Sequence, residues 1–280
     1  MPELPEVETT RRGLLKAVKG EKVASVTVRR RDLRFPIPKG LEGHVTGATI
    51  TNVRRRAKYL LIDIAKMGQK SPRKGVLLVH LGMSGSLTVQ KGPKYAPKTH
   101  DHVLIHFENG LIAAFHDPRR FGLMDWLEEG DEATHELLYH LGPEPLLQQF
   151  TPAYLSAALA RRKGPIKPVL MDQKLVVGVG NIYASESLYL SKVNPNTAAC
   201  KCAAKSAAII SAIRTTLSAA IKSGGSTLRD YVGAQNEGGY FQHHFNVYGR
   251  DGEPCFKCGA MIQTTTHAGR ATYWCPQCQR

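Results

Sequence analysis

Cys255-Phe256-Lys257-Cys258 and, sixteen residues further on, Cys275-Pro276-Gln277-Cys278 form two Cys-x-x-Cys pairs in the last part of the sequence. Two pairs at this spacing indicate a metal site and not disulfides, and they are typical of a zinc ribbon whose intervening residues form a hairpin. Four sulfur ligands leave no open position for water, so the sequence predicts one structural zinc ion held by Cys255, Cys258, Cys275 and Cys278. The metal would fold a segment that is too short to have its own core.

The sequence pattern changes from strand-like to helical near residue 151, well before these cysteines. Thr151-Pro152 resembles a helix N-cap followed by proline at the first helical position. Upstream, short apolar stretches separated by turn signals, with an Asn-Gly hairpin signature at 108–110, predict a β-sandwich with one helix over residues 7–18. The predicted strands cover residues 23–28, 44–53, 59–64, 76–81, 87–90, 103–107 and 111–115.

Downstream of residue 151 the helical period replaces the strand signal. Apolar residues at i, i+4 spacing predict a last long helix around Ile209 and Ile213, stopped by Gly224-Gly225. The next stretch, 230–244, is rich in Gly and has no period, which is typical of a mobile loop. We therefore predict an α+β chain of several domains. They are a β-sandwich (1–141), a linker (142–150), a helical domain (151–229), a flexible loop (230–245) and the zinc hairpin (246–280).

The composition is strongly basic. Lys plus Arg exceeds Asp plus Glu by fifteen, the sequence pI is about 9.7, and Arg29–Arg31 and Arg54–Arg56 concentrate part of the excess. Such a balance indicates a polyanionic partner. No apolar run approaches the ~20 residues of a membrane span, and the first residues do not resemble a signal peptide. We expect a soluble, cytoplasmic protein with no membrane partner.

A candidate catalytic group lies in the first residues, Met1-Pro2-Glu3-Leu4-Pro5-Glu6-Val7-Glu8. Removal of Met1 would leave Pro2 as a free secondary amine, and at neutral pH an α-amino group is neutral roughly several hundred times more often than a lysine. Pro2 is therefore a candidate nucleophile toward a sugar carbon, with Glu3 placed to move protons. In the structural alternative, Pro2 and Pro5 only stiffen the start of the chain, and Glu6 and Glu8 only occupy the first turn of a helix.

Two further patterns point to nucleic acid. Gly178-x-Gly180-Asn181 before a predicted helix offers backbone N–H groups to an anion, and the basic residues upstream of it favour a DNA phosphate. Gly82-Met83-Ser84-Gly85 and 117–122 each place a bulky residue on a glycine-flanked turn. Such residues usually pack in a core, but proteins that extrude a nucleotide insert similar side chains into the stack.

With these motifs in hand, the chain resembles the bacterial formamidopyrimidine-DNA glycosylases, a family of bifunctional base-excision repair enzymes. The resemblance spans essentially the whole chain. It implies a β-sandwich joined to a helix-two-turn-helix domain and a zinc finger, with double-stranded DNA that carries a damaged base as the partner of a monomeric protein. The matching motifs are residues 2–6, Lys58 before Tyr59-Leu60-Leu61, residues 81–85, 117–122 and 176–181, and the zinc hairpin with Arg270.

The resemblance also implies roles for individual residues. Pro2 would attack C1′ of the damaged nucleotide while Glu3 donates a proton to the deoxyribose. Lys58 and Arg270 would assist β- and δ-elimination and grip the flanking phosphates, and the loop near 230–240 would close over an everted purine. Met83, Arg119 and Phe121 would fill the vacated stack, with Arg119 facing the orphaned cytosine. The expected DNA contacts are His80, His100, Arg119, Arg162, Lys167 and Asn181.

Two other functions remain open from the sequence. A non-catalytic DNA-binding protein with a zinc ribbon explains the charge and the cysteines but gives no reason for Pro2-Glu3. An enzyme like endonuclease VIII would prefer oxidised pyrimidines, and Leu4 together with the Met83 and Arg119 motifs favours the purine enzyme instead. Residues 66–74 and 91–98 depart from the family by being longer or richer in lysine, and we expect them to be surface loops.

Overall fold

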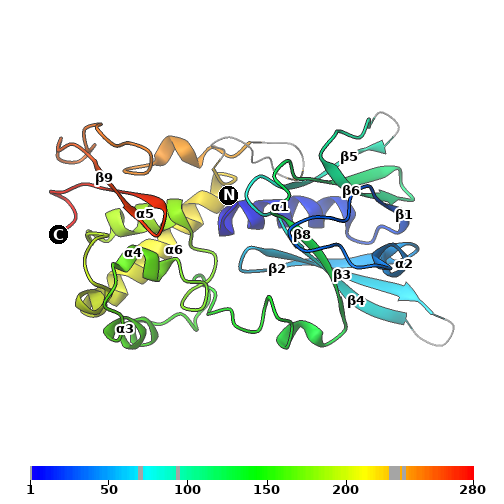
Figure 1. Ribbon diagram of the computed structural model, residues 1–280, viewed down its shortest axis with the longest axis horizontal. Coiled ribbons are helices and arrows are strands. Elements are labelled where there is room, and N and C mark those ends of the chain that lie inside the picture. The colour runs from blue at the N-terminus through cyan, green and yellow to red at the C-terminus, as the bar shows by residue number, and fades with distance from the viewer. Residues whose placement is uncertain (1, 69–71, 93–94, 227–233, 235–237) are drawn as a thin grey trace. The chain divides into compact units, whose positions relative to one another are not determined.

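The computed structural model describes residues 2–68, 72–92, 95–226, 234 and 238–280. Its contacts divide the chain into two compact units (Figure 1). The first contains Met1–Tyr139 and Ser223–Tyr240, and the second contains His140–Lys222 and Phe241–Arg280. The predicted helical domain and the predicted zinc hairpin thus share one unit.

The first unit is a β-sandwich, as the sequence predicts. It consists of two four-stranded antiparallel sheets, one in the order β1-β6-β7-β5 and the other in the order β2-β3-β4-β8. Apolar side chains of both sheets and of the first helix meet in one core. The strands are β1 (Val23–Val28), β2 (Thr49–Arg56), β3 (Tyr59–Met67), β4 (Pro72–His80), β5 (Ser86–Lys91), β6 (Asp101–Phe107), β7 (Leu111–His116) and β8 (Leu123–Glu128).

Several elements of this unit differ from the prediction. β3 runs to Met67 and β4 begins at Pro72, so residues 66–67 and 72–74 pair as strands, and the expected surface loop over 66–74 is wrong for them. The strand expected over 44–53 begins later, because α2 (Leu41–Val45) comes first and Gly47, with φ +77°, turns the chain into β2. β8 is not among the predicted strands, and its Asp125 and Glu128 are of types that are rare in strands. It forms because it pairs with β4 along its whole length and buries Leu123, Met124 and Leu127. The short 3₁₀ turn η2 (Asp131–Ala133) follows it.

Helix α1 (Leu4–Val18) begins three residues earlier than predicted. Glu3 is its N-cap, and a reciprocal capping box with Glu6 satisfies backbone donors that a helix start otherwise leaves unpaired. Val7 and Leu14 point into the sandwich core. The first turn of α1, and with it the position of Glu3, is therefore fixed both by its cap and by packing.

The second unit is helical with a terminal hairpin. Thr151 caps its first helix through a hydrogen bond from the Tyr154 backbone N–H to Oγ1 (3.1 Å), which confirms the predicted start. The elements are α3 (Pro152–Ala160), α4 (Ile166–Leu170), α5 (Asn181–Leu190), η3 (Ala199–Lys205), α6 (Ser206–Lys222), η4 (Phe241–His244), β9 (Gln263–His267) and β10 (Arg270–Trp274). Within the described ranges, no helix is both long enough and apolar enough to cross a membrane.

One buried carboxylate joins the helices to the segment that leads into the hairpin. Glu186 of α5 is 2 % exposed. It accepts hydrogen bonds from the backbone N–H groups of Asn246, Val247 and Tyr248 at 2.9–3.0 Å and from the Asn246 side chain at 3.0 Å. Such charge-assisted bonds are roughly twice as strong as neutral ones, so the chain entering the zinc hairpin is anchored on α5.

Candidate active site

The proposed nucleophile and its acid lie at the capped start of α1. Pro2 and Glu3 are both buried. Glu6 Oε2 accepts the Glu3 backbone N–H (2.8 Å), while its Oε1 accepts the backbone N–H and the hydroxyl of Ser226 (2.8 and 3.0 Å). Glu6 therefore has a structural role: it caps the first turn of α1 and binds Ser226. The spacing of Glu3 and Glu6, which is that of a capping box, was the signal in the sequence.

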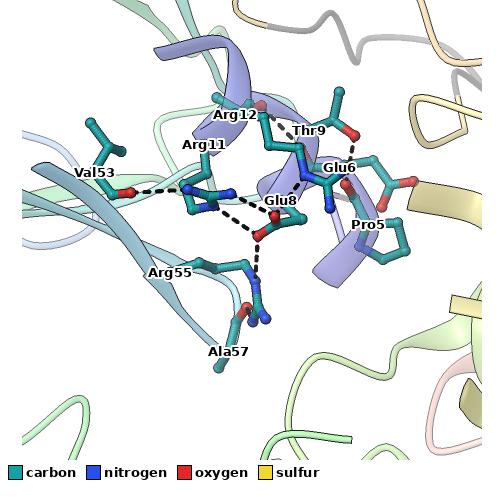
Figure 2. A network of polar contacts seen from close by, with 10 residues as sticks. Pro5, Glu6, Glu8, Thr9, Arg11, Arg12, Val53, Arg55 and Ala57 are labelled. Atoms are coloured by element: carbon teal, nitrogen blue, oxygen red, sulfur yellow. Dashed lines mark hydrogen bonds and ion pairs between the residues drawn. The ribbon is translucent and has the colours of Figure 1, made fainter. Parts of the chain in front are cut away.

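Glu8 is also more than a surface charge. Its carboxylate binds Arg11 (2.8 Å), Arg12 (2.9 Å) and Arg55 (3.3 Å), as Figure 2 shows. Burial raises the pKa of Glu8, but hydrogen bonds from Arg11 and Arg12 outweigh it and hold that pKa below its usual value. Arg55 donates in turn to the Ala57 carbonyl (2.9 Å) in the β2–β3 turn. A continuous chain of contacts therefore runs from α1 to this turn.

Lys58 follows Ala57 in that turn. Ala57 has φ +54°, an uncommon conformation for a residue with a side chain, and the Arg55 bond to its carbonyl helps to hold it. Lys58 itself is only 7 % exposed. The predicted catalytic lysine is thus presented by a two-residue turn whose backbone is tied to the helix that begins after Glu3.

His80, at the end of β4, lies in the electrostatic reach of Lys58. Burial, and then the positive charges of Lys58 and Arg34, lower the pKa of His80 to about 4. Its Nδ1 accepts the Gly82 backbone N–H (3.0 Å), so the imidazole keeps its proton on Nε2. At neutral pH the imidazole of His80 is therefore uncharged, with a hydrogen-bond donor at Nε2.

The two glycine-flanked turns meet in the structure. Met83 is 39 % exposed and Phe121 is 40 % exposed, so both apolar side chains reach the surface. Arg119 is exposed too, with its guanidinium carbon 5.0 Å from the centre of the Phe121 ring. A Cβ on Gly82 would come within 2.4 Å of the Gly122 nitrogen, so only glycine allows the two backbones to approach this closely. The structure therefore brings the three predicted void-filling residues together on one surface.

Asp117 joins these turns, and the sequence analysis assigned it no role. Its carboxylate is completely buried and accepts the Ser84 hydroxyl (2.9 Å), the Arg119 N–H (3.2 Å) and the Gly122 N–H (2.7 Å). One side chain thus fixes the turn that carries Met83 to the turn that carries Arg119. The signal that could have identified it is an aspartate directly after a strand, followed by Pro118 and, at the end of the turn, by Gly122.

His100 lies beside the same framework. Its carbonyl accepts the Asp117 backbone N–H (3.0 Å), and its ring lies edge-on to His102 and His116 at 6.3 and 5.9 Å between centres. His116 contacts the buried Asp101 (2.8 Å). His100 is half-buried, so its ring retains an accessible edge.

In the second unit, Lys167 and Asn181 meet at the zinc hairpin. Lys167 is 1 % exposed, and its ammonium donates to the Ala271 carbonyl (2.7 Å) and to Thr272 Oγ1 (2.9 Å). Asn181 Nδ2 donates to the same carbonyl (3.1 Å), and its Oδ1 has no partner among the described residues. Both side chains therefore hold the backbone next to Arg270, which is itself exposed at the start of β10.

Other groups that were predicted to contact an anion already have partners within the protein. Arg162, just after α3, forms an ion pair with Asp172 (2.8 Å). Gly180, and not Asn181, is the N-cap of α5, and the Gly178 N–H donates to the Gln173 side chain (2.8 Å). The predicted closing loop, 230–245, lies outside the described residues except for 234 and 238–245.

The four hairpin cysteines fit a zinc ion. Their sulfur atoms all lie within 4.8 Å of one another, with Cys258 and Cys275 at 3.4 Å and Cys255 and Cys278 at 3.9 Å. Zn–S bonds of about 2.3 Å in a tetrahedron place sulfur atoms about 3.8 Å apart. The protein therefore carries one structural zinc site. The hairpin above it turns at Ala268-Gly269, where both residues have positive φ.

Family models match three parts of the chain. They are the formamidopyrimidine-DNA glycosylase N-terminal domain over residues 1–124, the formamidopyrimidine-DNA glycosylase H2TH domain over 141–232, and the zinc finger found in FPG and IleRS over 252–280. The matches cover the catalytic and the DNA-binding parts together. They favour the glycosylase over a zinc-ribbon protein without catalytic function.

Curated relatives and solved structures indicate the same family as the family models. The formamidopyrimidine-DNA glycosylase of Xanthomonas oryzae pv. oryzae is 50% identical, with all of both chains covered. The crystal structure of the MutM (FPG) protein of Thermus thermophilus has 36% identity and a TM-score of 0.86, covering 99% of this chain and 98% of that one. A Lactococcus lactis FPG mutant in complex with a Fapy-dG containing DNA has 34% identity and a TM-score of 0.89 over 100% of both chains. This chain belongs to the formamidopyrimidine-DNA glycosylase family.

Proposed function

We propose that this protein excises oxidised purines from duplex DNA through a covalent intermediate on Pro2, and that it then cleaves the strand by β,δ-elimination. The protein is a DNA glycosylase of base-excision repair with AP lyase activity. The observation that carries the assignment of the nucleophile is the start of α1, where a capped and buried first turn places Pro2 next to Glu3. We further propose that the enzyme acts as a monomer in the bacterial cytoplasm.

The first step replaces the base by Pro2 at C1′ and opens the sugar ring. The neutral amine of Pro2 bonds to C1′ of the damaged nucleotide, and the base leaves with the electron pair of its bond to C1′. The nitrogen of Pro2 then gives up its own proton, which the departing base takes up, and Glu3 donates a proton to the sugar oxygen as the ring opens, so that an iminium forms between Pro2 and C1′. Because a secondary amine forms an iminium that is always cationic, the intermediate is an electron sink.

The iminium makes the next bonds easy to break. Loss of a proton from C2′ expels the 3′ phosphate, and loss of a second proton further along the sugar expels the 5′ phosphate. Lys58 lies in the turn tied through Arg55 and Glu8 to the helix that starts after Glu3. A buried ammonium there neutralises phosphate charge as it develops, and it assists both eliminations.

The remaining residues hold the DNA open. Met83, Arg119 and Phe121 fill the space that the extruded nucleotide leaves, with Arg119 toward the orphaned cytosine. Arg270 grips a phosphate from the hairpin that Lys167 and Asn181 hold at Ala271. His80, His100 and Arg162 contribute further DNA contacts. Zinc, held by Cys255, Cys258, Cys275 and Cys278, gives the hairpin its shape and supplies no chemistry to the reaction.

The test is borohydride trapping on a duplex with one 8-oxoguanine opposite cytosine. Reduction of the iminium should fix the protein to the DNA, and strand products should carry phosphate at both ends of the gap. An otherwise identical undamaged duplex should give no adduct, and a duplex with one oxidised pyrimidine should give less. Efficient excision without any adduct would rule out the covalent route, and preferred trapping on the pyrimidine duplex would overturn the purine preference.

The hairpin provides a separate prediction. Cys258→Ser should release zinc and weaken DNA binding, while the β-sandwich keeps its secondary structure because its core is independent of the metal. Arg270→Ala should leave zinc bound, cost about 1–3 kcal/mol of DNA binding and lower the salt slope of binding by about one. Zinc content, circular dichroism and binding over a salt series measure these effects.

The control for the hairpin experiment is Lys201→Ala, which removes an exposed cation of the same unit outside the hairpin. It should leave the lesion affinity within the scatter of the unmodified protein. If Cys258→Ser lost its zinc and still bound and cleaved lesion DNA normally, the role given to Arg270 would be wrong.

A further inference from the structure

A basic pocket lies at the C-terminal end of α5. Its volume is about 410 Å³, and it is lined by Lys192, Lys205, Lys257, Gln277, Cys278 and Arg280. Four of these side chains carry a positive charge and none is an aspartate or a glutamate. None of the roles described above for the reaction or for the lesion contacts uses this pocket.

The rim of the pocket is held by backbone contacts. The Arg280 N–H donates to the Lys192 carbonyl (3.3 Å), and the Lys205 ammonium donates to a main-chain oxygen of Arg280 (3.1 Å). Between them, the completely buried Gln279 donates to the Val193 carbonyl (2.9 Å) and accepts the Cys275 N–H (2.8 Å). The last residues are therefore fastened onto the end of α5, and the cations around them are brought together by the fold.

The zinc site contributes the other side of the pocket. Lys257 lies between Cys255 and Cys258, and Gln277 lies between Cys275 and Cys278. Four sulfur ligands fix the backbone of both Cys-x-x-Cys turns, so Lys257 extends from a rigid base. Lysine and arginine on a rigid rim, with an amide donor beside them, offer the donors that phosphate oxygens accept.

Like charges in one concave site raise the local potential and attract a polyanion. The pocket is broad and open to solvent, which fits a segment of a phosphodiester chain better than a small enclosed ligand. The pocket and the predicted lesion contact Asn181 lie at opposite ends of α5, because Asn181 begins the helix and Lys192 follows its last turn. A helix of this length spans about 15 Å, which corresponds to about four base pairs of duplex axis.

We propose that this pocket is a second DNA-binding site, which takes the sugar–phosphate backbone of DNA outside the segment gripped by the Arg270 hairpin. The inference rests on the proposed function only in that the partner is DNA. The site would hold the enzyme on long undamaged duplexes while it searches for lesions. Its contribution is electrostatic and independent of sequence, so it should appear as salt-dependent affinity.

The test combines Lys192→Gln, Lys205→Gln and Lys257→Gln in one variant. On an undamaged duplex of about four helical turns, the slope of log affinity against log salt should fall by about two to three, since each lost phosphate contact removes about 0.9. The matched control combines Lys16→Gln, Lys19→Gln and Lys39→Gln, three exposed lysines of the first unit, and loses the same charge. Its slope should change by less than about one.

Two further measurements separate this proposal from the others. On a lesion duplex of little more than one helical turn, both triple variants should excise the base at the same rate as the unmodified protein. A defect in catalysis would lower this excision rate and would not change the salt slope of binding to the long undamaged duplex. Equal slopes for the two triple variants would overturn the second site. The proposal would also be overturned if the pocket bound only free anions. In that case inorganic phosphate at constant ionic strength would stabilise the unmodified protein but not the variant without Lys192, Lys205 and Lys257, while the salt slope of DNA binding would be the same for both.

Discussion

We expect that a peptide tag left attached to the nitrogen of Pro2 abolishes the borohydride-trapped adduct on 8-oxoguanine DNA. The tag converts the amine into an amide, which has no basic lone pair and forms no iminium. Removing the tag to expose Pro2 should restore trapping to the full level. Because Pro2 is buried at the start of α1, the tagged protein must also be compared for lesion binding and thermal stability, so that blocked chemistry is separated from disturbed packing.

The companion variant is Pro2→Gly with a free N-terminus. Glycine supplies a primary amine at the same place, so some adduct should remain, although the imine must be protonated before it becomes an electron sink. Mass spectrometry of the trapped peptide should locate the sugar fragment on the first residue. An adduct located on Lys58 or any other lysine would contradict the assignment.

Glu3→Gln should slow base excision by about 10²–10⁴, the usual effect of losing a general acid or base. Lesion binding should stay within about tenfold, since the exchange keeps the size of the side chain and most of its contacts. The glutamine oxygen can still accept the Glu6 backbone N–H, and the Glu3 N–H still donates to the Glu6 carboxylate, so the helix cap persists. Single-turnover excision and binding to a duplex with a stable abasic-site analogue measure the two effects separately.

Two further variants serve as controls for the Glu3→Gln experiment. Glu129→Gln changes an exposed carboxylate that contacts Lys74 (3.1 Å) and should leave excision unchanged. Glu3→Ala removes the cap as well as the acid, so it should also lower thermal stability, which Glu3→Gln should not. Weakened binding with normal excision in Glu3→Gln would mean that Glu3 has a structural role only.

Much of the architecture could be predicted because it depends on local signals. The cysteine spacing predicts the zinc hairpin, Thr151-Pro152 predicts the start of α3, and Asn109-Gly110 predicts the β6–β7 turn, where Gly110 has φ +81°. The family motifs also identified the turns that carry Met83 and Phe121. Each of these signals lies within a few residues of the feature that it specifies, so no knowledge of distant contacts is needed.

The interpretation of single charged residues was less complete. Lys167 belongs to a basic stretch and was expected to be available to DNA, yet its ammonium is directed to the Ala271 carbonyl, more than a hundred residues away in the chain. Glu186 carried no signal in the sequence, but it binds three consecutive backbone N–H groups of another segment. A buried charge takes whatever donors or acceptors the fold brings to it, and local sequence does not encode them.

The sequence by itself determined the zinc ligands, the β-sandwich and the candidate nucleophile, because spacing, periodicity and the ionisation of an α-amine are local properties, and its motifs carried the resemblance to the family. Only the tertiary structure decided how these parts are held. It placed Asp117 between the two turns that carry the void-filling residues, and it linked Glu8 through Arg55 to the turn of Lys58. It also gathered Lys192 and Lys257 into one pocket. These contacts join residues far apart in the chain, so they exist only once the chain has folded.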